Sequence, residues 1–355
     1  MKESHLPRVG ISIGDLNGIG SEIILKTFED TRMFDFCIPV VFANAKLMNF
    51  FKKTYGSKTL IHSTASFEEL HTNKLNVYNA WEESVSVNFG KEDSKIGSYA
   101  FKSLDIATKA LQENLVDVLV TAPIHKNTIQ SDQFQFKGHT DFLNDKLEGN
   151  SIMLMVSDAL KVALLTDHVP LNEITKNLTP GSISEKISLI NNSMIKDFGI
   201  PKPKIAVLGI NPHTGDNGVI GHEDDEILKP TLKKLQQAGK LIYGPYAADS
   251  FFGNETYKQF DVTVACYHDQ GLIGFKTLAF GKGTNFTAGL SKIRTSPDHG
   301  TAFEIAGKKL ANHQSFKEAL FKALEIFRNR KDYEQYAQNK LKKASEKTSG
   351  KSTNN

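Results

Sequence analysis

The chain has 355 residues, of which 39% are hydrophobic and 23% are charged, a balance typical of a globular protein with a sizeable core. No apolar stretch reaches the roughly 18 uncharged residues that a membrane span needs. The first residues lack the apolar segment of a secretory signal, and two cysteines, Cys37 and Cys266, are too few for a disulfide framework. These features predict a soluble, cytoplasmic protein.

The net charge of +3 is concentrated near the C-terminus. Residues 328–355 contain eight Lys or Arg and three Asp or Glu, which leaves a net charge of −2 for the rest of the chain. The body has no basic patch with interleaved aromatic residues, so binding to nucleic acid is not expected. The Ser- and Lys-rich residues 341–355 are predicted to form a disordered tail.

Short apolar segments alternate with helical patterns along the chain. Buried strands rich in Val, Ile and Leu are predicted at 8–14, 38–44, 116–124, 160–168, 204–215 and 260–271. Helical patterns lie between them at 21–30, 98–114, 182–199 and 223–239, and a last one covers 315–330. Strands of this kind alternating with helices indicate an α/β fold with a largely parallel central sheet.

Three of the predicted strands are followed by a histidine, namely His168, His213 and His268. The carboxyl ends of parallel strands lie at one edge of a sheet, where ligands bind, so the three imidazoles can converge. Three protein ligands with an open position are typical of a catalytic metal site. Taken alone, however, a histidine after a strand is more often a loop or cap residue, and the spacing leaves both interpretations open.

Other side chains near these histidines have possible supporting roles. Asp167, Asp249 and Asp269 are available to orient the imidazoles or to add an oxygen ligand. Cys266, two residues before His268, is a possible further ligand, although a small buried core cysteine is the more common outcome.

Anion-binding features occur at two places in the chain. A glycine-rich turn at residues 14–22 precedes the first predicted helix, whose N-terminus can hold an anion. It is not a G-x-G-x-x-G fingerprint, and no such motif follows any predicted strand. Later in the chain, Lys276, Asn285 and Arg294 are able to hold a phosphate or carboxylate, although each taken alone is equally compatible with an exposed strand position.

Eight segments between about residues 8 and 310 follow one another in a characteristic order: GDLNGIGSEI, LVTAPIHK, GHTDFL, LLTDHVPL, GINPHTGDNG, AADSFF, CYHDQGLIGFK and IRTSPDHGTAFEIAG. Together they resemble the 4-hydroxythreonine-4-phosphate dehydrogenases of pyridoxal phosphate biosynthesis. The last segment also resembles the loop that holds the adenosine end of the dinucleotide in isocitrate and isopropylmalate dehydrogenases. Leu16, Ser21 and His125 stand where the family usually has proline, proline and asparagine, which leaves room for a divergent substrate.

The resemblance implies a fold of two α/β domains with a cleft between them, like that of isocitrate and isopropylmalate dehydrogenases. Residues 1–135 with 298–340 would form the first domain, which carries the adenosine loop. Residues 136–297 would form the second domain, which carries the metal and substrate ligands. A homodimer with an active site shared between subunits is also implied, and we expect His168 and His213 to come from one subunit and His268 from the other.

The resemblance also assigns roles to individual residues. It implies NAD or NADP as cofactor, one divalent metal (Zn, Mg or Co) in each site, and a small phosphorylated acid as substrate. The assigned residues are His168, His213 and His268 for the metal; His139, Thr140, Lys276, Asn285 and Arg294 for the substrate; His299, Gly300, Thr301 and Asn312 for the cofactor; and Lys276, Asp269 and Asp249 for catalysis.

The implied reaction is the NAD-dependent and metal-dependent oxidation of 4-phosphooxy-L-threonine at C3, followed by decarboxylation to 3-amino-2-oxopropyl phosphate. Lys276 can serve as the base only if it does not bind the phosphate. Two alternatives remain: a related dehydrogenase of threonate or erythronate 4-phosphate, and a three-histidine metallohydrolase that uses no dinucleotide. The segment DHGTAFEIAG argues against the hydrolase.

Overall fold

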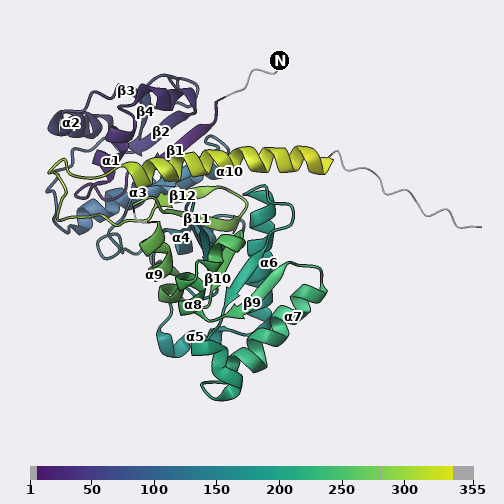
Figure 1. Cartoon of the computed structure of the whole chain (residues 1–355). Helices are drawn as coiled ribbons and strands as arrows, with labels where there is room; N and C mark the ends of the chain where they lie inside the picture. Colours follow the sequence, from purple (N-terminus) through teal and green to yellow (C-terminus); the bar gives the residue numbers. More distant parts are fainter. Residues whose placement is uncertain (1–5, 280, 339–355) are drawn as a thin grey trace, which may run out of the picture.

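The structure is a computed structural model and describes residues 6–279 and 281–338. Its strands form one continuous sheet of twelve strands (Figure 1). From one edge to the other the strands are β3 (Ile61–Thr64), β4 (Leu75–Asn79), β2 (Ile38–Ala43), β1 (Arg8–Ser12), β5 (Val118–Thr121), β12 (Arg294–Pro297), β11 (Thr284–Leu290), β6 (Gly149–Val156), β7 (Lys161–Leu164), β10 (Val262–Ala265), β8 (Ile205–Leu208) and β9 (Ile242–Tyr246).

Most neighbouring strands in this sheet are parallel. The exceptions lie at its centre, where β11 is antiparallel to β12 and β6, and β6 is antiparallel to β7. The parallel group β3, β4, β2, β1, β5 and β12 lies on one side of this centre. The parallel group β7, β10, β8 and β9 lies on the other side.

Helices cover both groups of strands. They are α1 (Gly20–Thr27), α2 (Ala45–Tyr55), α3 (Ser94–Gln112), α4 (His139–Lys146), α5 (Ile174–Asn177), α6 (Pro180–Lys196), α7 (Lys229–Gln237), α8 (Ala248–Gly253), α9 (His268–Leu278) and α10 (Gln314–Gln338). The long α10, yellow in Figure 1, contacts β5, β11 and β12 at the centre of the sheet and also contacts α1 and α6. It thereby packs across the centre of the sheet, between α1 and α6.

Local sequence signals explain where several helices begin and end. The side chain of Asn44 accepts a hydrogen bond from the Leu47 N–H at the start of α2, and Gly56 ends that helix with a φ of 69°. At the start of α6, Thr179 and Ser182 form a reciprocal capping box, and Pro180 occupies the first helical position.

The predicted α/β fold is confirmed. The six strands predicted from the sequence correspond to β1, β2, β5, β7, β8 and β10, and these are buried as continuous apolar strands. The segments predicted as two domains share the single sheet, and the proposed boundaries remain a prediction. The predicted disordered tail at 341–355 lies outside the described residues. Within the described residues, no helix combines the length and hydropathy that crossing a bilayer requires.

Candidate active site

A cavity of about 240 Å³ lies at the centre of the sheet. Its walls come from the end of β5, the start of α4, the strands β6, β11 and β12, helix α9 and the segment that follows β12. This volume is below the usual range of roughly 300–1,000 Å³ for ligand pockets, so the cavity suits a small acid. A dinucleotide would have to extend beyond it.

Arg294 lines this cavity from the start of β12, although only 2% of its surface is exposed. Its Nε and Nη2 donate to Thr121 Oγ1 at 3.1 and 2.6 Å, and its Nη1 donates to Thr287 Oγ1 at 3.1 Å. No carboxylate of the described residues pairs with it, and burial lowers the pKa of Arg294 to about 9. A buried cation without a counter-ion beside a cavity is suited to binding an anionic ligand.

The N-terminal end of α4 borders the same cavity through Gly138, His139 and Thr140. The Nε2 atom of His139 is buried and has no hydrogen-bond partner among the described residues. Burial, aided by the charges of Arg294 and Lys126, holds the pKa of His139 well below its usual value, so its ring is neutral at pH 7. The free N–H groups of a helix N-terminus beside Arg294 favour binding of a phosphate.

Two further predicted substrate residues lie in this cavity. Asn285 on β11 pairs with Ser296 of β12 in the sheet register, and its buried Oδ1 has no partner among the described residues. Lys276, in the last turn of α9, also lines the cavity. The structure therefore brings together all five side chains that were predicted to bind substrate.

His168 and His268 lie side by side at the edge of the cavity, with ring centroids 5.7 Å apart. His268 Nδ1 is 2.7 Å from Asp269 Oδ1, whereas His168 Nδ1 is 3.8 Å from Asp167 Oδ2. Burial is the main reason that the pKa of His168 is lowered, which favours the neutral, ligating form of its ring. Because each Nδ1 atom faces an aspartate carboxylate, the Nε2 atom of each ring is the one available to coordinate a metal.

His213 does not line this cavity, and no group of three or more His, Cys, Asp or Glu in the described part of the chain is placed to hold a metal ion. We expected His168 and His213 from one subunit and His268 from the other. In this chain His168 instead lies beside His268, which favours grouping these two residues in one subunit. β8 ends at Leu208, and the fully buried Asp224 then accepts the N–H groups of Ile210 and Asn211, both at 2.9 Å.

The segment that carries His213 has an unusual backbone. Five consecutive residues, 213–217, have φ values between 44° and 84°, and only Gly215 among them is a glycine. Such left-handed conformations cost energy in non-glycine residues and commonly occur at functional sites. Beyond them, Val219 and Ile220 are 82% and 43% exposed, so an apolar tip extends from this loop.

The remaining predicted residues around the histidines lie as follows. Asp269 contacts His268, as described above, while Asp249 occupies the first turn of α8 and does not line the cavity. Cys266 is fully buried, and its Sγ is 3.2 Å from the carbonyl oxygen of Leu208. Burial raises the pKa of the Cys266 thiol, so its alternative interpretation as a core residue is confirmed.

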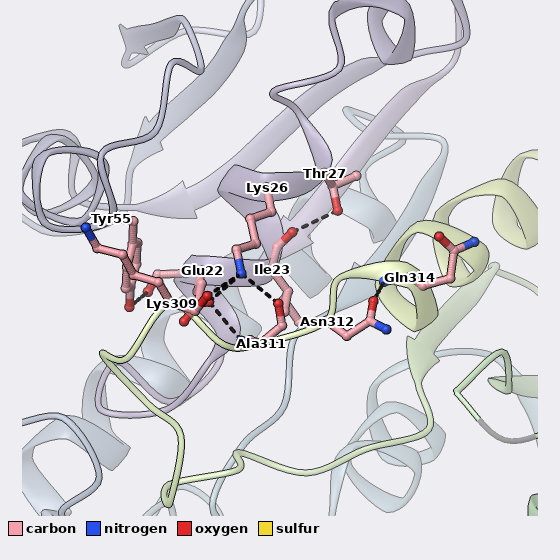
Figure 2. Close-up of polar contacts among 10 residues, drawn as sticks. Glu22, Ile23, Lys26, Thr27, Tyr55, Lys309, Ala311, Asn312 and Gln314 are labelled. Carbon is pink, nitrogen blue, oxygen red and sulfur yellow. Dashed lines mark hydrogen bonds and ion pairs between the residues drawn. The ribbon is translucent and has the colours of Figure 1, made fainter.

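The predicted cofactor residues lie on the segment 298–313, which joins β12 to α10. His299 and Gly300 line the cavity, and the Nε2 of His299 is buried without a partner among the described residues. Thr301 is buried, and its carbonyl oxygen accepts the Ile19 N–H at 3.1 Å. Asn312 Oδ1 accepts the Gln314 N–H at 2.9 Å at the start of α10 (Figure 2).

Some cavity residues were not assigned from the sequence. Lys126 and Asp141 belong to two of the segments that carry the resemblance, LVTAPIHK and GHTDFL, but neither received a role. Met153 and Met155 come from β6, which was not predicted because its polar start and antiparallel pairing differ from the other strands. Asp298 follows β12, and its Oδ1 accepts a hydrogen bond from the Ser315 hydroxyl. The two residues are far apart in the sequence, so no local pattern predicts this contact.

A family model described as "Pyridoxal phosphate biosynthetic protein PdxA" matches residues 35–323. A 4-hydroxythreonine-4-phosphate dehydrogenase of Bacteroides thetaiotaomicron is 43% identical over 345 residues, covering 97% of this chain and 94% of that protein. A D-threonate 4-phosphate dehydrogenase of Cupriavidus necator is 33% identical over 91% of this chain and 98% of its own length.

The solved structures agree with these relatives. The crystal structure of a 4-hydroxythreonine-4-phosphate dehydrogenase from Klebsiella pneumoniae superposes with a TM-score of 0.79, at 29% identity over 92% of this chain and 99% of that one. The predicted resemblance is confirmed by the family match, the identity to the relatives and this superposition. The chain belongs to the family of the pyridoxal phosphate biosynthetic protein PdxA and is an oxidoreductase.

Proposed function

We propose that this protein oxidises 4-phosphooxy-L-threonine at C3 with NAD⁺ or NADP⁺, and that the 3-oxo acid loses carbon dioxide to give 3-amino-2-oxopropyl phosphate. The observation that carries the proposal is the buried Arg294, a cation without a counter-ion beside a small cavity. The substrate phosphate would supply the missing negative charge, with the N-terminal end of α4 as a second phosphate contact. The experiment that tests it is NADH formation with this substrate.

The other predicted substrate residues suit the acid end of the molecule. Asn285 offers an amide whose Oδ1 has no partner among the described residues, and Lys276 offers a cation at the end of α9. With the phosphate held by Arg294, Lys276 is free to bind the carboxylate as a cation or, in its neutral amine form, to take the proton of the C3 hydroxyl. These contacts would hold C3 near the His168–His268 pair.

The residues present fit a divalent metal in part. Two imidazoles with Nδ1 atoms near carboxylates supply two ligands, and we propose that His213 of the partner subunit supplies the third. When bound, the metal lowers the pKa of the C3 hydroxyl and stabilises negative charge on its oxygen. Asp269 would orient the His268 ring.

A homodimer would complete this site. A second hollow of about 330 Å³ adjoins His168 and His268 and includes Leu171, which is 76% exposed. The His213 loop ends in the exposed Val219 and Ile220. Their apolar side chains are suited to pack against the apolar residues of this hollow, such as Leu171. In a two-fold symmetric dimer, the His213 loop of each subunit would enter the hollow of the other.

The dinucleotide also fits the residues present. NAD⁺ supplies the hydride acceptor when it is bound. His299 and Gly300 reach the cavity, and the rest of the segment 298–313 continues away from it, so the adenosine end would lie along this segment. The buried Nε2 of His299 is available to form a hydrogen bond with this ligand.

A second candidate function is the oxidation of D-threonate 4-phosphate, favoured by the similarity to the Cupriavidus necator enzyme. The two substrates differ in carrying an ammonium group or a hydroxyl group beside the carboxylate. Asp141 lines the cavity, its charge acts on His168, and no hydrogen bond or ion pair joins it to another described side chain. Such a carboxylate favours a substrate with an ammonium group.

Replacing Asp141 with asparagine separates the two candidates. We expect kcat/KM for 4-phosphooxy-L-threonine to fall roughly ten-fold, since a hydrogen bond between charged groups is lost, and to change little for D-threonate 4-phosphate. The matched control is Asp145→Asn on the same helix, where the carboxylate pairs with Lys146 at 3.0 Å and lies outside the cavity. An equal loss with both substrates would show that Asp141 does not recognise the ammonium group.

A further inference from the structure

The segment 298–313 is held by α1 at two places. Near its beginning, the Thr301 carbonyl accepts the N–H of Ile19, the N-cap residue of α1. Gly18 lies so close that an added Cβ would meet the Thr301 carbonyl oxygen at 2.9 Å. Near its end, the segment meets two charged side chains of α1, Glu22 and Lys26 (Figure 2).

Glu22 and Lys26 form three directional contacts with the backbone of this segment. Glu22 Oε1 accepts the Ala311 N–H at 2.9 Å, and Lys26 Nζ donates to the carbonyl oxygens of Lys309 at 3.0 Å and Ala311 at 2.8 Å. The two side chains also pair with each other at 2.7 Å across one turn of α1, as Figure 2 shows. Together they fix the position of residues 309–311 relative to the helix.

The burial of this ion pair indicates a geometric role. The Glu22 side chain is fully buried, and its second oxygen, Oε2, has no hydrogen-bond partner among the described residues. Burying a carboxylate in this way costs desolvation energy, and a well-packed apolar residue often gives equal or greater stability. What an apolar residue cannot provide is a fixed hydrogen-bonding position for the backbone of the neighbouring segment.

We propose that Glu22 and Lys26 are positioning residues for the dinucleotide. This rests on the proposed function, in which the adenosine end lies along the segment 298–313. With Thr301 and residues 309–311 both held to α1, the intervening turn has one position relative to the cavity. Loss of the Glu22–Lys26 pair would free its far end and weaken dinucleotide binding, while the phosphate site around Arg294 stays intact.

The test compares Lys26→Met and Glu22→Gln with the wild-type chain. Lys26→Met keeps the aliphatic stem but removes all of its hydrogen bonds, whereas Glu22→Gln keeps an acceptor for the Ala311 N–H. Lys26→Arg keeps the charge and serves as the conservative rescue. The matched control is Lys109→Met, because Lys109 pairs with Asp105 at the same helical spacing and at 2.7 Å on the exposed face of α3. All are measured as full-length proteins below their unfolding midpoints.

We expect Lys26→Met to raise the NAD⁺ dissociation constant about ten-fold, with a smaller rise in Glu22→Gln and values near wild type in Lys26→Arg and Lys109→Met. Amide exchange of residues 301–311 should quicken in Lys26→Met. At saturating NAD⁺, kcat and the KM for the phosphorylated substrate should remain within about two-fold of wild type.

Two results would overturn the proposal in distinguishable ways. Unchanged NAD⁺ affinity in a folded Lys26→Met protein that turns over normally would show that the pair is only structural, and the proposed function would stand. A wild-type chain that binds neither NAD⁺ nor NADP⁺ would overturn both the proposed function and this role of Glu22 and Lys26.

Discussion

Replacing Arg294 with methionine is expected to lower kcat/KM for 4-phosphooxy-L-threonine by roughly ten- to a hundred-fold, because a hydrogen bond to a charged group contributes about 1.5–3 kcal/mol. The loss should be much smaller with the same acid lacking its phosphate. Initial rates of NADH formation with the two substrates measure both effects. An equal loss with both would show that Arg294 does not recognise the phosphate.

Arg330 provides the matched control, since it is the other buried arginine of the described residues. Its Nε donates to the buried Asp197 at 2.6 Å, so Arg330→Met leaves a buried carboxylate unpaired. The expected cost is about 3–5 kcal/mol of the free energy of unfolding. Arg294→Met instead removes a buried cation that has no counter-ion, so thermal stability without ligand should be unchanged or higher. A drop as large as that of Arg330→Met would indicate a structural role for Arg294.

The second large effect concerns the shared site. His168→Ala and His213→Ala homodimers are each expected to be inactive, but a mixed dimer would have one doubly damaged site and one intact site, because two-fold symmetry pairs the two defects. Random re-association makes half of the dimers mixed, each half active, so about one quarter of wild-type activity should return. The two variants are dissociated, refolded together and assayed for NADH formation and bound metal.

The control mixture is His168→Ala with His268→Ala. Both residues lie in the same subunit's site, so every site in a mixed dimer carries one defect and no activity should return. Recovery in this control, or none in the first mixture after subunit exchange is confirmed by mass, would contradict the sharing of the site by way of His213.

The sequence predicted the site best for residues that directly follow a strand. His168 and His268 meet because β7 and β10 are parallel neighbours, as a buried apolar strand followed by a histidine leads one to expect. His213 follows β8, which also neighbours β10, yet it does not join them. After β8, the buried carboxylate of Asp224 accepts hydrogen bonds from the N–H groups of residues 210 and 211 and so fixes the path of the chain toward His213. No pattern around residue 213 signals this long-range contact.

Pattern reasoning missed β3, β4 and β9 toward the two edges of the sheet, and β6, β11 and β12 at its centre. β11 and β12 contain polar residues such as Asn285, Thr287 and Arg294, because these side chains line the cavity or serve it. At the centre of the sheet, apolar periodicity is therefore weak where the site is built. Arg294 illustrates the difficulty: an exposed strand position was an equal alternative from sequence, and only the structure shows its burial.

The most direct test of the proposed function is NADH formation by the purified, metal-loaded protein with NAD⁺ and 4-phosphooxy-L-threonine, compared with D-threonate 4-phosphate under the same conditions. We predict turnover of 4-phosphooxy-L-threonine with the higher kcat/KM, dependent on a divalent metal. Turnover of D-threonate 4-phosphate alone, or of neither acid by a folded protein that binds the dinucleotide, would contradict it.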